Sequence, residues 1–415
     1  MREKFQKLWL KLVVIFAVIG PGIIAANADN DAGGITTYSV VGAQFGTRML
    51  WILFLITISL AVTQEMGMRI GLVTRQGLGG VIREKFGVRW TAFAMMAMLI
   101  ANLGTITAEF AGIAASFGIF GISKYWSVPL AALAVWFILY KGSFKTTQKI
   151  FLVFSAFYIV YIINGFIVKP DFGMALKDLV TPYVEWNVPF FLAAIALIGT
   201  TITPWGQFFI QSYVADKGLS IKHYGIEKGE IYFGAVLTNV VSFFIIISTA
   251  ATLYKHGITI HDAGDAALAL RPLAGDFAQW LFAFGLFSAS MLGAFILPSA
   301  TAYAVCEAFG WESGFDTTWK NGKFFYGFIL LSIIVPCVIV LLPQISLVKV
   351  MILSQDVNGI LLPFILLFVM KIVNDSEIMG QYVNKLWGNI ISWLTIIGIL
   401  VATVVLVVSS LLGFN

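Results

Sequence analysis

The sequence predicts an all-α membrane protein with eleven transmembrane helices, and three observations support this. Hydrophobic residues make up 59% of the 415 residues and charged residues 11%, whereas soluble domains average about 45–50% and about 25%. Apolar segments long enough to cross a bilayer core, roughly 20 residues each, recur along the chain. Lys and Arg gather in alternate connecting segments. The lipid bilayer is therefore the expected surrounding of this chain.

Eleven apolar segments meet the length requirement, with boundaries good to a few residues. They lie at about 12–43, 49–70, 91–119, 125–140, 149–168, 188–214, 230–253, 275–305, 324–343, 346–371 and 388–412. The two longest loops, near 169–187 and 254–274, could hold short surface helices. Because no hydrophilic segment is long enough for a separate folded domain, residues 1–415 are predicted to form a single transmembrane domain.

The basic residues predict the orientation. If the N-terminus is cytoplasmic, the outside segments hold only seven of the 26 Lys and Arg residues: Arg48, Lys124, Lys169, Lys177, Lys255, Arg271 and Lys349. Basic loops stay in the cytoplasm, so we expect a multi-pass protein of the inner (plasma) membrane with its C-terminus outside. This asymmetry explains the net charge of +5 without nucleic acid. Cys306 and Cys337 lie in apolar runs and predict neither disulfides nor a thiolate metal site.

The first span contains residues that are costly in a lipid-facing helix. Gly20-Pro21-Gly22 is followed by Asn27-Ala28-Asp29-Asn30-Asp31-Ala32-Gly33-Gly34. Each charge at mid-span costs about 2.5–3.5 kcal/mol on insertion scales, and paired glycines weaken a helix. These features predict a break in the helix near Asp31.

The sixth span is interrupted in a similar way by Gly199-Thr200-Thr201-Ile202-Thr203-Pro204-Trp205-Gly206-Gln207. Pro204 removes a backbone donor and clashes with the preceding turn. Either break alone could be a kink that helps helices pack. Together they begin two successive five-span blocks, which is the pattern of an inverted-repeat transporter with a site at the membrane midplane. The repeats are predicted at about 12–168 and 188–371, with an extra helix at about 388–412.

The residues at these breaks resemble those of the NRAMP divalent-metal transporters. The first span of that family reads GPG and then DPGN, and its sixth span contains MPHN. The matching segments here are Gly20–Gly22, Asp31–Gly34, Thr203–Gly206, Gln64–Thr74, Ser354–Gln355 and Leu361–Phe364. The resemblance covers nearly the whole chain and implies a LeuT-like 5+5 inverted repeat with broken first and sixth helices.

The departures from the family pattern imply a different ligand set. The metal-binding Asp is kept as Asp31, but the family Asn is Gly34 and the family Met is Thr203. The backbone carbonyl one turn earlier would be that of Thr200, and Gln207 could add an oxygen. A thioether selects transition metals, whereas a hydroxyl does not. Mg²⁺ keeps several waters and uses few carboxylates, so the set resembles that of the prokaryotic NRAMP-related magnesium transporters, with Mn²⁺ also carried.

The resemblance also suggests that proton coupling is absent. The sixth-span His of proton-coupled relatives is Trp205 here, and the third span has only Glu109, beside Ala108 at the family Asp position. The three histidines are expected in loops: His223, His256 and His261. Without relay groups a proton path is difficult to build.

Other polar residues near the breaks have two interpretations each. Asp29 and Asn27 could contact the hydrated ion from a vestibule or simply bond to neighbouring spans. Gln355 could close over the ion or be an interfacial polar group at a helix end. Trp205 could only fill the space left by the missing His.

Several polar groups are interpreted as structural. Glu65 is expected to pair with Arg69 one helical turn away. The segment from Asp356 to Gly359 is expected to serve packing and hydrogen bonding. Glu307, at the end of the eighth span, is interpreted as solvated.

Two function classes compete with a hydrated-cation transporter. A membrane-embedded enzyme would need paired catalytic carboxylates, a GxSxG turn or an HExxH helix, and the sequence contains none of these. An organic-solute transporter of the same architecture would avoid a bare anion like Asp31 beside a substrate carboxylate. A proton-coupled Mn²⁺/Fe²⁺ importer is the nearest alternative, disfavoured by Thr203 and Trp205. No cofactor beyond the transported ion, no nucleic acid and no obligate protein partner is expected.

Overall fold

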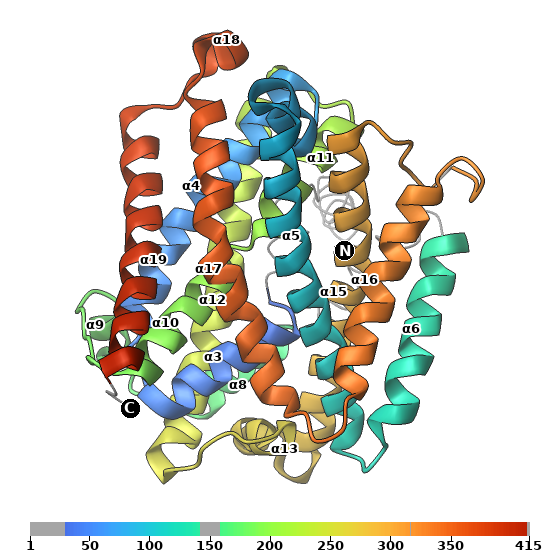
Figure 1. Cartoon of the computed structure of the whole chain (residues 1–415). Coiled ribbons are helices and arrows are strands. Elements are labelled where there is room, and N and C mark those ends of the chain that lie inside the picture. Colours follow the sequence, from blue (N-terminus) through green and yellow to red (C-terminus); the bar gives the residue numbers. More distant parts are fainter. Residues whose placement is uncertain (1–29, 142–157, 316, 413–415) are drawn as a thin grey trace, which may run out of the picture.

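The computed structural model describes residues 30–141, 158–315 and 317–412. This part of the chain contains helices and loops without any strand. The long helices run roughly side by side (Figure 1). Their bounds are α3 (Ala32–Phe45), α4 (Leu50–Thr74), α5 (Leu78–Gly118), α6 (Lys124–Lys141), α8 (Ile159–Ile167), α10 (Val188–Thr201), α11 (Pro204–Asp216), α12 (Tyr224–Thr252), α15 (Ala278–Phe309), α16 (Lys323–Leu341), α17 (Leu347–Val373) and α19 (Leu386–Leu412).

The described residues contain eight helical segments long and apolar enough to cross a membrane. They match eight of the eleven predicted spans and confirm a multi-pass helical protein, although the full count of eleven is not confirmed. Of the first and fifth spans only α3 and α8 are described. The fourth corresponds to α6, whose 18 residues begin and end with lysine.

The predicted long loops contain short helices, as expected. The first holds α9 (Phe172–Asp178), and the second holds α13 (Ala263–Ala267) and α14 (Arg271–Ala274), with one short 3₁₀ turn between these two helices. A further short helix, α18 (Ser376–Met379), precedes α19. Figure 1 shows α18 at one end of the bundle and α13 at the other.

The connection before the third span differs from the prediction. It was expected to be a loop up to about residue 90, but α5 begins at Leu78 and bends at Gly87. Gly87 has φ 76°, a left-handed conformation that glycine adopts without steric cost. The segment before Gly87 is therefore a helical arm set at an angle to the membrane-crossing part of α5.

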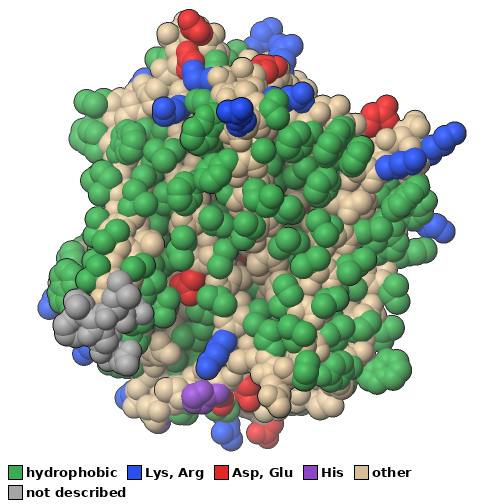
Figure 2. Space-filling model, viewed as in Figure 1, with side chains coloured by type: hydrophobic (Ala, Val, Ile, Leu, Met, Phe, Trp, Pro, Cys, Tyr) green, Lys and Arg blue, Asp and Glu red, His purple; other side chains and the backbone are tan. Residues whose placement is uncertain are grey.

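Helix α5 lies at the centre of the bundle, against α15 and α17. The half-helix α3 packs on α12, α17 and α10, while α19 lies at the edge against α10, α17 and α4 (Figure 1). Hydrophobic side chains form a broad band across the face shown in Figure 2, and most charged side chains on this face lie above or below the band. This distribution is what a bilayer requires of a multi-pass protein.

Candidate metal-binding site

The described part of the first break begins at Asn30 and Asp31. Asp31 has extended backbone angles and forms the N-cap of α3, where its Oδ1 accepts a hydrogen bond of 2.7 Å from the amide of Gly34. Its side chain is 2% exposed. A short acidic residue is a favourable N-cap because it satisfies a free backbone donor. Asp31 is thus a buried carboxyl group at the start of α3, and the predicted earlier part of the first span, before residue 30, lies outside the described residues.

The sixth span is interrupted as predicted. Helix α10 ends at Thr201, Ile202 and Thr203 leave the helical conformation, and α11 begins at Pro204. The hydroxyl of Thr203 accepts a hydrogen bond of 3.3 Å from the amide of Gly206. Proline fits the first position of a helix because its missing N–H would be unpaired there anyway. Thr203 and Asp31 therefore make the same type of cap, each bonded to the amide three residues later.

The end of α10 adds acceptors to this region. The last carbonyl groups of a helix lack intrahelical donors and carry partial negative charge. Thr200 lies in the last turn of α10, and its own hydroxyl has no hydrogen-bond partner among the described residues. Carboxylate, hydroxyl and carbonyl oxygens are the ligands that Mg²⁺ and Mn²⁺ accept.

Gln355 of α17 links the two interrupted spans. Its side-chain amide packs so closely on Gly33 of α3 that any side chain at position 33 would overlap it. Its backbone carbonyl packs in the same way on Gly199 of α10. The side chain is fully buried, and its Oε1 accepts a hydrogen bond of 3.0 Å from Asn358. Gln355 is therefore a buried residue that contacts both α3 and α10, which contradicts its alternative interpretation as an interfacial group.

The other residues of the sixth break are buried. Trp205 is 1% exposed and packs edge-on against Phe209 with ring centroids 5.7 Å apart. Its indole N–H has no partner among the described residues. Gln207 is 1% exposed and its Oε1 lies towards Gly67 of α4. Thr203 and Thr200 thus lie at the break itself, whereas Gln207 faces the neighbouring helix α4.

Gly34 contributes its backbone amide to the Asp31 cap and has no side chain to offer an ion. Asp29 and Asn27 lie outside the described residues. No cluster of three or more His, Cys, Asp or Glu side chains suited to a metal occurs in the described part of the chain. The acidic side chains at this position are Asp31 and the adjacent Glu109, and the other candidate ligands are neutral oxygens.

Glu109 of α5 belongs to this site, although the sequence interpretation used it only to argue about protons. It is fully buried and hydrogen bonded to the Asp31 carboxyl group, and its Oε2 accepts from the amide of Ala32 at 3.4 Å. A Cβ at Gly293 of α15 would overlap its carboxyl group. The signal was present in the sequence, because a mid-span carboxyl group is itself evidence of a functional site.

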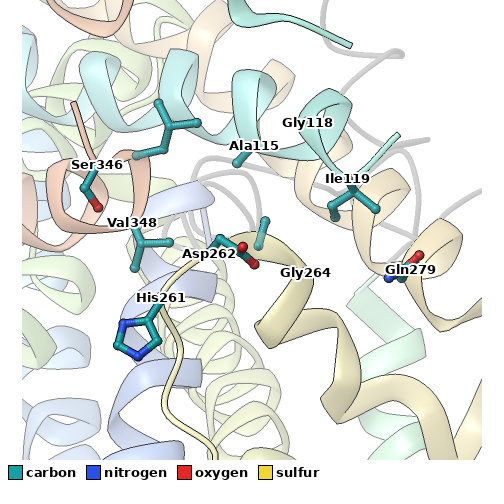
Figure 3. A pocket seen from close by; sticks show the side chains of 11 residues that line it. Ala115, Gly118, Ile119, His261, Asp262, Gly264, Gln279, Ser346 and Val348 are labelled. Carbon is teal, nitrogen blue, oxygen red and sulfur yellow. The ribbon is translucent and has the colours of Figure 1, made fainter. Parts of the chain in front are cut away.

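A cavity of about 470 Å³ opens at the end of the bundle that carries α13. Figure 3 shows Asp262 and His261 of the loop before α13, with residues from the end of α5 and the start of α17, around this cavity. A second cavity, of about 10 Å³, shares Asp262 and Val348 with it and reaches Thr36 of α3. There the Thr36 hydroxyl donates a hydrogen bond of 3.4 Å to the sulfur of Met351.

The opposite end of the bundle is held by side-chain hydrogen bonds. Glu307 of α15 accepts from the amide of Gly77, before α5, and from the hydroxyl of Ser212 on α11 at 3.2 Å. The expectation that Glu307 is only solvated is therefore wrong, because its carboxylate accepts hydrogen bonds from the segment before α5 and from α11. Glu65 and Arg69 form the predicted pair, with Nε and Oε1 3.0 Å apart.

Comparison with known proteins identifies the family. The family described as "Natural resistance-associated macrophage protein-like" matches residues 22–409. The chain belongs to the NRAMP family. This confirms the family resemblance, which covers nearly the whole chain.

The similar proteins include curated NRAMP members and solved transporter structures. "Divalent metal cation transporter MntH" of Caldanaerobacter subterraneus subsp. tengcongensis is 23% identical, with 99% of this chain and 96% of the relative covered. The Bacillus subtilis (strain 168) protein of the same name is also 23% identical, with 94% and 92% covered. A crystal structure of the Eremococcus coleocola manganese transporter has a TM-score of 0.73 at 19% identity, covering 95% of this chain and 86% of that one.

The fold is also shared outside the NRAMP family. The crystal structure of MhsT in complex with L-phenylalanine has a TM-score of 0.59 at 15% identity, covering 94% of this chain and 97% of that one. The architecture is thus that of NRAMP and LeuT-fold proteins. The curated relatives are named as transporters and not as enzymes.

Proposed function

We propose that this NRAMP protein transports divalent metal ions, with Mg²⁺ as its main substrate and Mn²⁺ also carried. The observation that carries the proposal is the buried carboxyl group of Asp31 at the N-terminus of α3, a helix that packs against α10. The relatives named as divalent metal cation and manganese transporters support the substrate class. A cation suits this arrangement better than an organic solute with a carboxylate, because the charge of Asp31 would repel that carboxylate.

The preference for Mg²⁺ rests on the chemistry of the donors. Asp31 supplies one carboxylate, Thr203 and Thr200 supply hydroxyl or carbonyl oxygens, and Gly34 leaves space where a longer side chain would stand. Mg²⁺ is dehydrated reluctantly and is commonly bound through one or two carboxylates with several waters retained. Gln355 stands close enough to α3 to contact the hydrated ion from α17. The two predicted five-span repeats would each supply one broken helix to this site.

Transport without proton coupling is the second part of the proposal. Trp205 cannot titrate, and the three histidines lie in the loops and turns of the described structure. Glu109 contacts Asp31 and the amide of Ala32, and in this proposal it does not pass protons across the membrane. The membrane potential alone favours uptake of a divalent cation by about 4.6 kcal/mol per 100 mV, twice the single-charge value.

A binding experiment tests the site. Isothermal titration of the purified full-length protein with Mg²⁺ and Mn²⁺ should show binding of both, and Asp31→Ala should abolish it. Asp356→Asn is the matched control, since Asp356 is another carboxyl group of a membrane helix, 5% exposed, and this variant should bind normally. Mn²⁺ binding without Mg²⁺ binding would refute the proposed preference.

A transport experiment tests the coupling. Proteoliposomes with an internal pH dye and a Mg²⁺ dye should show Mg²⁺ uptake without acidification. Thr203→Met should shift the preference towards Mn²⁺, because a thioether is a softer ligand than a hydroxyl. Acidification that depends on both Mg²⁺ and Asp31 would show that the transporter is proton-coupled.

A further inference from the structure

The side chain of Asn30, directly before Asp31, is bonded to a different helix. Its Nδ2 donates to the hydroxyl of Thr238 on α12 at 2.7 Å and lies 3.3 Å from the Thr238 carbonyl oxygen. Its Oδ1 accepts from the hydroxyl of Ser242, one turn later on α12, at 3.1 Å. Asn30 is 1% exposed. Both the nitrogen and the oxygen of the Asn30 side-chain amide are thus hydrogen bonded to α12.

The backbone of Asn30 is held by a third residue. The hydroxyl of Tyr158, directly before α8, donates to the Asn30 carbonyl oxygen at 2.9 Å. In an interrupted span, carbonyl groups released from the helix are the usual cation ligands. Here the Asn30 carbonyl already accepts a hydrogen bond from a tyrosine, so the residue next to Asp31 is fixed through its side chain and its backbone.

We propose that Asn30 is a positioning residue for Asp31, holding the first break against α12 and α8 so that the carboxyl group stays oriented for a hydrated ion. The inference rests on the proposed role of Asp31 as the anchor of that ion. A chain segment outside a helix has conformational freedom that binding would otherwise have to remove. Hydrogen bonds that order it beforehand increase affinity without touching the ion.

A purely structural role predicts a different outcome, and transport kinetics distinguish the two. If these bonds only stabilise the fold, their loss lowers the melting temperature and the amount of active transporter, which reduces the maximal rate. If they orient Asp31, their loss raises KM for Mg²⁺ in the molecules that remain folded. The two effects can be measured on the same protein preparation.

The decisive variant is Thr238→Val, which keeps the shape of Thr238 but removes the hydroxyl that accepts from Asn30. We expect about a tenfold increase in KM for Mg²⁺ uptake into proteoliposomes and in Kd by titration, as for a lost buried hydrogen bond. Thr238→Ser should restore both values. Ser242→Ala removes the bond to the other end of the amide and should raise KM in the same direction, which keeps the test decisive if Thr238→Val folds poorly.

The chain offers a matched control in the Asn102–Thr301 pair. The Nδ2 of Asn102 on α5 donates to the hydroxyl of Thr301 on α15, also at 2.7 Å and also buried. Thr301→Val therefore removes the same kind of bond from a different pair of helices. It should lower the melting temperature without changing KM.

Two results would overturn the proposal. One is an unchanged KM in both folded variants, Thr238→Val and Ser242→Ala. The other is an equal rise of KM in Thr301→Val, which would mark a general effect of lost stability. Failure of the proposed function looks different: Asp31→Ala would then bind Mg²⁺ as well as the unmodified protein.

Discussion

Helices α10 and α17 approach each other closely at Gly359, and this contact offers a quantitative test of the site. A Cβ added at Gly359 would lie 2.6 Å from the carbonyl oxygen of Ile195 and 2.8 Å from its Cγ2. Ordinary van der Waals contact begins at 3.4 Å, so Gly359→Ala must separate the two helices by about 3.4 − 2.6 = 0.8 Å. The obstacle includes backbone, which cannot rotate away as a flexible side chain can.

The expected cost follows from this overlap. Overpacking a buried position costs about 1–3 kcal/mol, while replacing a mid-helix glycine by alanine returns about 1 kcal/mol of helix propensity. The net loss of folding free energy should be about 0–2 kcal/mol. The functional effect should be larger, because Gly359 lies one turn after Gln355, whose backbone carbonyl faces Gly199 of α10. Moving α17 away from α10 displaces Gln355 from both interrupted spans.

The assay compares Gly359→Ala with Gly229→Ala in α12. At Gly229 a Cβ meets no atom within 4 Å, so this control should gain stability from helix propensity alone. We expect Gly359→Ala to melt below the Gly229→Ala protein and to show a KM for Mg²⁺ raised severalfold. Equal melting temperatures together with an unchanged KM would show that the close contact between α10 and α17 does not hold the site.

Two further predictions concern the end of the bundle opposite the α13 cavity. Arg69→Leu should lower the free energy of unfolding by about 3–5 kcal/mol, because it leaves the Glu65 carboxylate without its buried ion-pair partner. Thermal melts measure this loss, and the double variant with Glu65→Gln should recover part of it. Glu307→Gln keeps the size of the side chain but removes the charge that accepts from Gly77 and Ser212. It should increase the labelling of a cysteine introduced at Ala215 of α11 in a Cys306→Ala, Cys337→Ala background, which leaves the Ser212 hydroxyl in place. Unchanged labelling would show that Glu307 does not hold α11 in place.

The interrupted helices could be predicted from the sequence because their causes are local. Asp31 can cap a helix through the amide of Gly34, three residues along the chain, and Pro204 cannot continue the helix before it. The apolar segments can likewise be recognised by their length, because a helix needs about 20 apolar residues to cross the bilayer core. The helical arm before Gly87 was missed because a short polar segment has no such length signal.

The partners of the site depend on contacts between residues far apart in the chain. Glu109 reaches Asp31 across 78 positions, and Asn30 reaches Thr238 across 208. Each of these side chains could be recognised as a costly polar group in a span, but nothing local indicates which helix it faces.

The sequence by itself determined the membrane class, the interruption of the sixth span and the carboxyl group that caps α3. These depend on composition and on bonds within one turn of helix. Only the tertiary structure decided that Glu109 joins Asp31, that Gln355 contacts both broken spans and that Asn30 is held by α12. The physical reason is that helix packing selects the facing residues, and the glycines at positions 33, 199 and 293 allow the close approach that brings these side chains together.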